Sequence, residues 1–287
     1  MDDTLFFSPN EIFINEVIDK LSKTDLELEV EESVAGFLGV HIDRSESGQI
    51  KLTQEGLTKQ IIEAPNIRDL PRKFIPATSE PLTKDEYGDP PNSTYNYASI
   101  IGMLQYSQGH SRPDITYAVS QCARFTHSPK KSHEIALERI GQYLKEIVDK
   151  GLILCPTALE DVDVFVDADF SGLWPYEDKC DPVSVKSRTG YVITVASCPV
   201  IWTSKLQTEI ALSTMEGEYN ALSLCMKTVL PFHCTLKKVI KSLKQNNNEP
   251  EISFKVSIWE DNIGALTLAN LEPGRHTPRS KHYGIKI

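Results

Sequence analysis

Five carboxylate residues stand where their spacing could support chemistry, and three of them end apolar strands. Asp167 and Asp169 lie at the end of the apolar strand VDVFVDADF, and Asp261 ends the similar run FKVSIWED. In an open α/β sheet, ligands gather at the carboxyl ends of the strands. If these two strands are neighbours, their terminal acids project at the same edge of the sheet.

The other two acids, Glu216 and Glu218, lie two residues apart in the run LSTMEGEYNAL, which is typical of a helix start. Ser213 can cap this helix, and Glu216 follows three residues later, as in a capping box. Glu218 instead falls on the apolar stripe with Ala221, Leu222 and Cys225. A glutamate on a buried stripe is costly unless charged partners or a metal stabilise it. The pattern therefore predicts Glu218 as a ligand and Glu216 as a cap.

Asp167, Glu218 and Asp261, if they converge, would form a site of hard oxygen ligands suited to Mg²⁺ or Mn²⁺. Two such ions can activate a water molecule and stabilise the leaving oxygen of a phosphodiester. The alternative is that the aspartates merely end strands, as acids often do at turns. The residues by themselves leave both interpretations open.

The elements that must position these acids form the second part of the chain. Alternation and capping predict strands over 162–170, 187–197, 199–205 and 254–261, and helices over 213–243 and 262–270. This order indicates a mixed α/β sheet with helices on its faces.

The first part of the chain has a different organisation. We expect strands over 1–7 and 26–30, a helix from Asn10 to about Ser22, a hairpin of 34–43 with 49–54, and a helix over 56–64. A proline-rich extended connector, 65–92, follows. Three helices, starting near Tyr95, Pro113 and Pro129, complete this part.

Composition sets further bounds. The 287 residues are enough for two domains, and 40% are hydrophobic, an ordinary globular value. We expect an intracellular protein, cytoplasmic or nuclear, since neither a signal peptide nor a membrane segment is evident and the six cysteines lack the spacing of a disulfide or zinc framework. The net charge of −10 disfavours strong nucleic-acid binding. Residues 273–287, however, contain no acid and form a basic segment that includes Arg275, Arg279, Lys281 and His282. It is either a nucleic-acid-binding segment that contacts phosphates or a solvated terminus.

Several motifs together resemble the polyproteins of copia-type long-terminal-repeat retrotransposons. GFLGVHIDR, YNYASIIGMLQYSQGHSRPDITYAVSQCARF and ERIGQYLKEIVDKGLIL resemble the end of the reverse transcriptase. VDADFSG, SRTGYVITV, PVIWTSKLQTEIALSTMEGEYNAL and WEDNIGALTLAN resemble the ribonuclease H domain that follows it. The resemblance covers nearly the whole chain in the family's order.

The resemblance implies an α/β and α+β fold in four parts. These are the C-terminal part of a reverse-transcriptase palm (1–64), the connector (65–92), a helical thumb or connection (93–155), and a ribonuclease H-like mixed sheet with helices (160–287). The last part would lack the family's final strand and helix, which carry a fourth aspartate.

The implied activity is Mg²⁺-dependent cleavage of the RNA strand of RNA–DNA hybrids, with the hybrid and other parts of the polyprotein as partners. Matching the motifs residue by residue gives Asp167, Glu218 and Asp261 as catalytic metal ligands, with Asp169 and Glu216 as second choices.

Two departures from the family pattern matter. Asp2 and Asp3 would be the remnant of the polymerase motif, whose partner aspartate would lie upstream, so polymerase activity is not expected. Without the fourth acid, nuclease activity is expected to be impaired. The alternative hypotheses are a non-catalytic retrotransposon relic that at most binds nucleic acid, and a different nuclease of the same general fold such as an integrase core.

Overall fold

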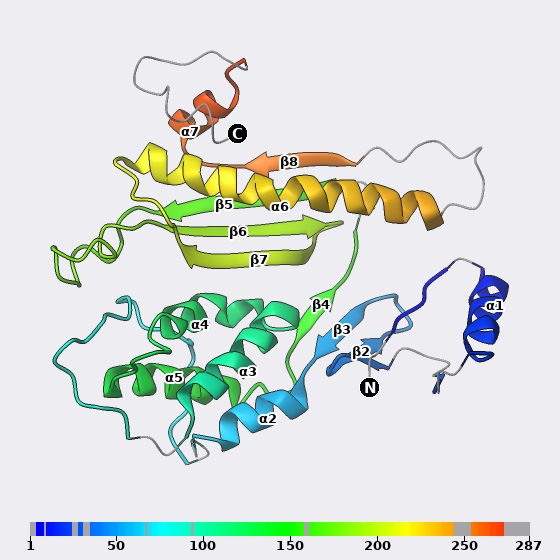
Figure 1. Ribbon diagram of the computed structural model, residues 1–287, viewed down its shortest axis with the longest axis horizontal. Coiled ribbons are helices and arrows are strands. Elements are labelled where there is room, and N and C mark those ends of the chain that lie inside the picture. Colours follow the sequence, from blue (N-terminus) through cyan, green and yellow to red (C-terminus); the bar gives the residue numbers. More distant parts are fainter. Residues whose placement is uncertain are drawn as a thin grey trace.

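The computed structural model describes residues 4–8, 10–24, 28–30, 35–65, 67, 69–92, 95–157, 161–243 and 254–272. The described part is mixed α/β, with two four-stranded sheets and seven α-helices. Figure 1 shows the second sheet with its long helix α6 above, and the smaller sheet and a group of shorter helices below.

The first sheet contains β1 (Gly36–Phe37), β2 (Val40–Arg44), β3 (Ile50–Thr53) and β4 (Leu152–Leu154), in that order and all antiparallel. The predicted hairpin is confirmed as β2 and β3. Its turn closes with a hydrogen bond from the Ser45 N–H to the Gln49 carbonyl, and Gly48 takes the positive φ of 81° that the turn requires. β4 was not predicted.

Two predicted strands are wrong in the residues that the structure describes. Residues 4–7 and 28–30 carry no strand, and in the described part no neighbouring strand pairs with them. An extended apolar segment becomes a strand only where a partner satisfies its backbone groups. The predicted helix between them is confirmed as α1 (Glu11–Leu21), capped by the Asn10 side chain, although none of its residues is buried.

The helical group contains α2 (Glu55–Glu63), α3 (Tyr97–His110), the 3₁₀ turn η1 (Pro113–Ile115), α4 (Thr116–Ala123) and α5 (Lys131–Leu144). Its core is built from fully buried aliphatic side chains, among them Ile100, Leu104, Val119, Leu137 and Ile140. The connector 65–92 has no helix or strand in its described residues, as predicted. It is held against α5, where Glu134 accepts a hydrogen bond from the Asn92 N–H and the His133 ring bonds the Thr83 carbonyl.

The second sheet has the order β7-β6-β5-β8. Its strands are β5 (Asp161–Asp169), β6 (Arg188–Val195), β7 (Cys198–Leu206) and β8 (Lys255–Trp259), and its helices are α6 (Thr214–Leu243) and α7 (Ile263–Ala269). β8 is parallel to β5, and the other pairs are antiparallel. Along β5, Val162, Val164 and Val166 are buried in the core that α6 covers, while Phe165 and Asp167, each of which follows a buried valine, are exposed. Strand alternation therefore places Asp167 on the face away from α6.

The helical group docks on that opposite face through three polar contacts. The Trp202 indole donates to the Gln108 carbonyl at 2.8 Å, and the Arg188 guanidinium donates to the Ser120 hydroxyl at 2.8 Å. Arg124 forms a 2.8 Å ion pair with Glu177 in the loop between β5 and β6. These contacts fix the helical group beside the sheet.

Within the described residues, no helix has both the length and the apolar character required to cross a membrane. All six cysteines are free thiols.

Candidate metal centre

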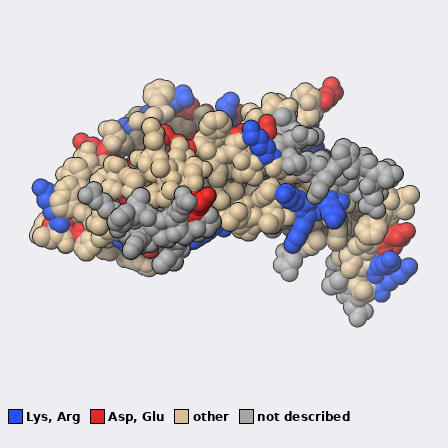
Figure 2. Space-filling view, turned by 90° about the horizontal axis from the view of Figure 1, so that it is seen from above, with Lys and Arg blue, Asp and Glu red and all other residues tan. Residues whose placement is uncertain are grey.

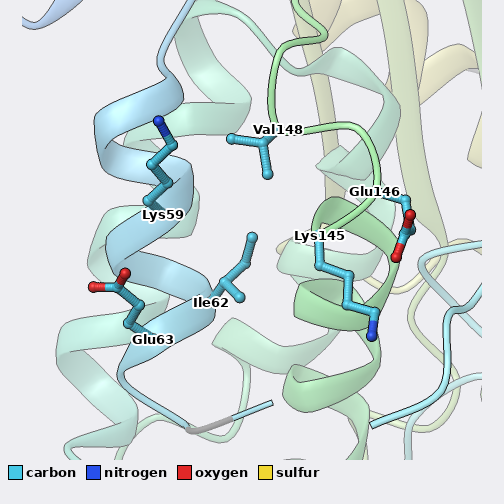
Figure 3. Close-up of a pocket in the computed structure, with 6 residues that line it drawn as sticks. All are labelled: Lys59, Ile62, Glu63, Lys145, Glu146 and Val148. Carbon is cyan, nitrogen blue, oxygen red and sulfur yellow. The ribbon is translucent and has the colours of Figure 1, made fainter. Parts of the chain in front are cut away.

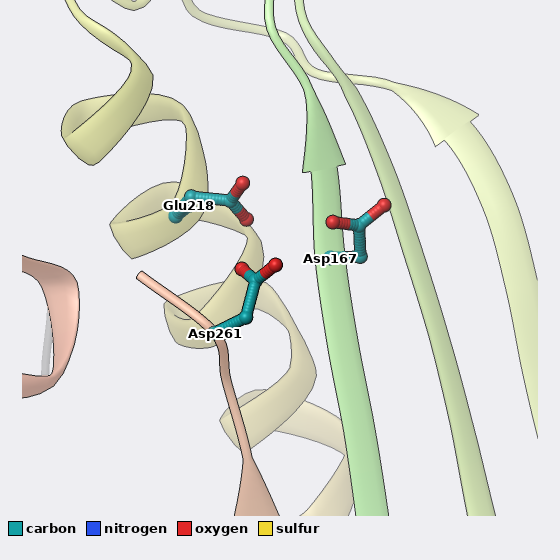
Figure 4. A group of neighbouring side chains, drawn as sticks. All are labelled: Asp167, Glu218 and Asp261. Atoms are coloured by element: carbon teal, nitrogen blue, oxygen red, sulfur yellow. The ribbon is translucent and has the colours of Figure 1, made fainter. Parts of the chain in front are cut away.

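Three carboxylates from three elements meet at one edge of the second sheet. One oxygen each of Asp167, Glu218 and Asp261 lies within 4.8 Å of the other two (Figure 4). The parallel register pairs Val164 with Ile258 and Phe165 with Trp259, so Asp167 and Asp261 each follow by two residues and reach the same edge. The prediction that the two acid-bearing strands are neighbours is confirmed.

Glu218 is the buried member of this trio, with 8% of its surface exposed, because α6 turns it toward the sheet. Its Oε2 atom is buried and has no hydrogen-bond partner in the described part of the chain. The pKa of Glu218 is raised to about 7, chiefly by burial and also by the negative charges of Glu260, Asp167 and Asp261, while a hydrogen bond from the Ala168 backbone acts to lower it. Since burial and like charges both oppose ionisation here, the site favours a bound cation or proton.

Glu216 does not take this role, because its carboxylate is already hydrogen-bonded at the start of α6. Its Oε2 accepts a hydrogen bond from the Leu212 N–H at 2.8 Å, and its own N–H donates to the Ser213 hydroxyl at 3.2 Å. This is the reciprocal capping that the sequence predicted, with the carboxylate reaching one residue further upstream than in the usual box.

Asp169, the other second-choice residue, does not join the cluster. It ends β5, paired with Arg188 in the register, and its carboxylate lies against Gly172 in the following turn. A Cβ at Gly172 would come within 1.9 Å of this carboxylate, so a larger residue there would require the Asp169 side chain to move.

A further acid was missed by the sequence analysis. Glu260, directly before Asp261, is 8% exposed; its Oε1 accepts from the Asn262 N–H at 3.0 Å, and its Oε2 is buried with no partner among the described residues. Burial raises the pKa of Glu260, and the charges of Asp261 and Asp167 act in the same direction. The available signal was the alternation of β8, which places Glu260 on the same side as the core residues Val256 and Ile258.

The remaining predicted site residues lie outside the described residues. They are Asp2 and Asp3 of the polymerase motif, and Arg275, Arg279, Lys281 and His282 of the basic segment.

The residues present at the cluster fit a divalent cation. None of the three carboxylates forms an ion pair with any Lys or Arg that the structure describes. Carboxylate oxygens are the donors that Mg²⁺ and Mn²⁺ prefer, and a buried carboxylate oxygen without a partner calls for a positive charge.

A groove of about 380 Å³ adjoins Asp167 on the face away from α6. Its lining includes Pro113 and Tyr117 from the helical group and Phe165, Asp167 and Trp202 from the sheet. Next to it, the rings of Phe165 and Trp259 stack with centroids 6.4 Å apart, and both side chains are about half exposed. The groove thus offers exposed aromatic faces beside the acids.

A second hollow, of about 270 Å³, lies between α2 and the end of α5 (Figure 3). Two lysines and two glutamates line it beside the apolar Ile62 and Val148, and none of the three acids of the cluster belongs to it. Its balanced charges indicate no particular chemistry.

The SRPD motif has a structural role in the described residues. Arg112 is buried and donates two hydrogen bonds to Asp114, which also accepts one from the Tyr143 hydroxyl. Burial acts to raise the pKa of Asp114, but the hydrogen bonds and charge of Arg112 outweigh it and lower that pKa. The motif therefore joins η1 to α5.

Fold and site together define a mixed α/β protein with a cluster of acids suited to a divalent cation, and comparison with known proteins shows which proteins it resembles. The chain is 29% identical over 286 residues to the retrovirus-related Pol polyprotein from transposon RE2 of Arabidopsis thaliana, covering 99% of this chain and 18% of the relative. It is 28% identical over 285 residues to that from transposon RE1 of the same plant, with the same coverage. It is 27% identical over 296 residues to that from transposon TNT 1-94 of Nicotiana tabacum, covering 100% of this chain and 20% of the relative.

Over nearly its whole length the chain is therefore similar to one region of the Pol polyproteins of copia-type transposons, which supports an origin in a retrotransposon polyprotein. It spans about a fifth of the length of these relatives. No family model matches it, and no solved structure does.

Proposed function

We propose that the second sheet with its helices is a ribonuclease H-like domain that cleaves the RNA strand of RNA–DNA hybrids with the help of a divalent cation. The observation that carries this proposal is the convergence of Asp167, Glu218 and Asp261 within 4.8 Å. Kinship with Pol polyproteins supports a role in the replication of a transposon, in which other parts of the polyprotein are partners.

Asp167, Glu218 and Asp261 would hold Mg²⁺ or Mn²⁺ through their carboxylate oxygens. The bound ion would activate a water molecule and stabilise the leaving oxygen of the phosphodiester. Hydrolysis consumes one water, breaks the bond between phosphorus and the 3′ oxygen, and leaves a 3′-hydroxyl and a 5′-phosphate.

The groove beside Asp167 would receive the substrate. Stacking of a base on an aromatic side chain contributes about 1–3 kcal/mol and tolerates any base, which suits an enzyme without sequence preference. Tyr117 and Phe165 line this groove, Trp259 stacks on Phe165, and all three rings are exposed. The RNA strand would be distinguished from DNA by its 2′-hydroxyl groups.

The other parts of the chain are assigned from the family. We propose that the first sheet belongs to a reverse-transcriptase palm and that the helical group is its thumb or connection. The polar contacts of Trp202, Arg188 and Arg124 would then keep this part beside the nuclease site.

Cleavage of an end-labelled RNA–DNA hybrid with Mg²⁺ tests the proposal. Asp167→Asn and Asp261→Asn are each expected to lower the rate by about two orders of magnitude or more, since even residues behind metal ligands contribute 10–100-fold. Asp169→Asn is the matched control, because it makes the same chemical change on the same strand outside the cluster, and it should cleave at the wild-type rate.

Equal rates for the wild type and the two cluster variants would refute the assignment. Salt-sensitive binding of the hybrid without any cleavage would favour a non-catalytic nucleic-acid-binding module instead.

A further inference from the structure

The end of β8 carries a second buried acid whose charge has no evident counterpart. Glu260 has 8% of its surface exposed, and no Lys or Arg in the described part of the chain pairs with it. One oxygen, Oε1, accepts from the Asn262 N–H, and the other, Oε2, is buried with no partner there. A buried carboxylate in this condition costs several kcal/mol unless a cation or proton compensates it.

Glu260 directly precedes Asp261 and borders the three-acid cluster, although its carboxylate is not among those whose oxygens lie within 4.8 Å of one another. The side chains of Val256 and Ile258 pack in the core under α6, so alternation along β8 directs Glu260 to the same side, where Glu218 lies. Among neighbouring charges, that of Glu260 acts most strongly on Glu218, ahead of Asp167 and Asp261. The unpaired Oε2 atoms of Glu218 and Glu260 are both buried in this region.

Local structure fixes Glu260 in place. The Asn262 side chain caps α7 by accepting from the Ala265 N–H, while its backbone N–H holds Glu260. The bond from Asn262 restrains the Oε1 atom of Glu260 and with it the orientation of the carboxylate. A ligand that is held before the cation arrives binds it with less loss of conformational entropy.

We propose that Glu260 is a fourth carboxylate ligand of the divalent-cation centre, contributing its Oε2 from the α6 side of the site. This inference rests on the proposed metal site formed by Asp167, Glu218 and Asp261. It adds Glu260 to that site, whereas the sequence analysis had predicted only the next residue, Asp261. A bound cation would compensate the charge of Glu260 and explain why one of its oxygens is buried without a hydrogen-bond partner.

Calorimetric titration of the metal-free chain with Mn²⁺ tests the proposal without reference to activity. Glu260→Gln keeps the size of the side chain and its hydrogen bond from the Asn262 N–H but removes the charge. We expect it to weaken Mn²⁺ binding by roughly tenfold or more. Asp169→Asn, which removes a charge near the cluster but outside it, should bind Mn²⁺ as the wild type does.

Thermal unfolding supplies the second measurement. Without metal, Glu260→Gln should unfold at the same temperature as the wild type or higher, because a repulsive buried charge is gone. With saturating Mn²⁺, its rise in Tm should be smaller than that of the wild type. Should Glu260→Gln fail to fold, Glu260→Asp, which keeps the charge but withdraws the carboxylate, must also weaken Mn²⁺ binding.

The outcomes separate this inference from the proposed function. Wild-type Mn²⁺ affinity in Glu260→Gln, together with lost affinity in Asp167→Asn, would overturn the role of Glu260 and leave the three-acid site standing. A wild-type chain that takes up no Mn²⁺ would overturn both.

Discussion

Glu218 occupies an environment that couples folding, protonation and cation binding in one carboxyl group. Its folded-state pKa of about 7 lies above its ordinary value of 4.5, because the side chain is buried and surrounded by like charges. A cation binds only the ionised form, so binding of the metal below pH 7 must release a proton. Lowering the pH therefore weakens the binding of a metal ion at Glu218.

The raised pKa predicts a pH-dependent stability of the metal-free chain. The folded state binds the Glu218 proton more tightly than the unfolded state does, so this group stabilises the fold below pH 4.5 and that contribution is lost as the pH rises to about 7. Glu218→Gln removes this dependence. Urea denaturation at pH 5 and pH 8 should show a larger loss of stability in the wild type than in Glu218→Gln, and equal losses would contradict the prediction.

At the level of single residues, the sequence pattern predicted different roles for two glutamates that lie only two residues apart. Glu216 had the spacing of a cap, Glu218 shared a stripe with Ala221 and Cys225, and the structure places both accordingly. Glu260 was not predicted because a single strand of five residues gives weak alternation, and its neighbour Asp261 already matched a motif. Whether any of these acids binds a metal stays a prediction.

Among the elements, the contact of the helical group with the β5–β6 loop rests on one ion pair. The Arg124 and Glu177 side chains are 14% and 5% exposed, and Arg124 also donates to the Leu82 carbonyl, so this pair joins α4, the connector and the loop. Removing one partner of a buried pair leaves the other charge uncompensated.

We predict that Arg124→Ala lowers the free energy of unfolding by roughly 3–5 kcal/mol. The control is Lys59→Ala, which breaks the exposed pair with Glu55 on α2 and should cost less than about 0.5 kcal/mol. Chemical denaturation of the two variants beside the wild type measures the difference. A small effect of Arg124→Ala would mean that the docking of the helical group does not depend on this pair.

Helices with a capping residue and strands with a long alternation of apolar and polar residues were predictable from the sequence. Strands that form only by pairing with a strand far away in the chain were not. Asn10, Pro113 and Asn262 mark helix starts as expected, and the alternation of β5 is clear in the sequence. α5 ends at Leu144, although apolar residues continue at helical spacing as far as Ile147 in the sequence. β4 has only three residues, and nothing local distinguishes it from the end of a helix-flanking loop.

For the whole molecule, charge limits how strongly a nucleic acid can be held. The chain carries a net charge of −10, and on the face in Figure 2 the Lys and Arg side chains lie in several separate groups rather than in one continuous patch. Affinity for a hybrid would then come more from stacking in the groove and from the cation than from many phosphate contacts.

This distribution predicts a shallow salt dependence of hybrid binding. In fluorescence anisotropy with a labelled hybrid and Ca²⁺ in place of Mg²⁺, the slope of log K against log salt should correspond to only about two or three phosphate contacts. Phe165→Ala should weaken binding at every salt concentration without changing the slope. A steep slope would show instead that basic residues dominate the interface.

The pairing of β3 with β4 also dictates an order of assembly. Ile50 lies opposite Leu154, so the connector and all helices from α2 to α5 must leave the ribosome before the first sheet can gain its last strand. Until then the unpaired edge of β3 can form hydrogen bonds with a strand of another chain, and a contact between residues so far apart in the sequence forms slowly. Completion of the small sheet is thus a late event in biosynthesis, and a nascent chain halted before Leu152 would hold only three of its four strands, β1 to β3.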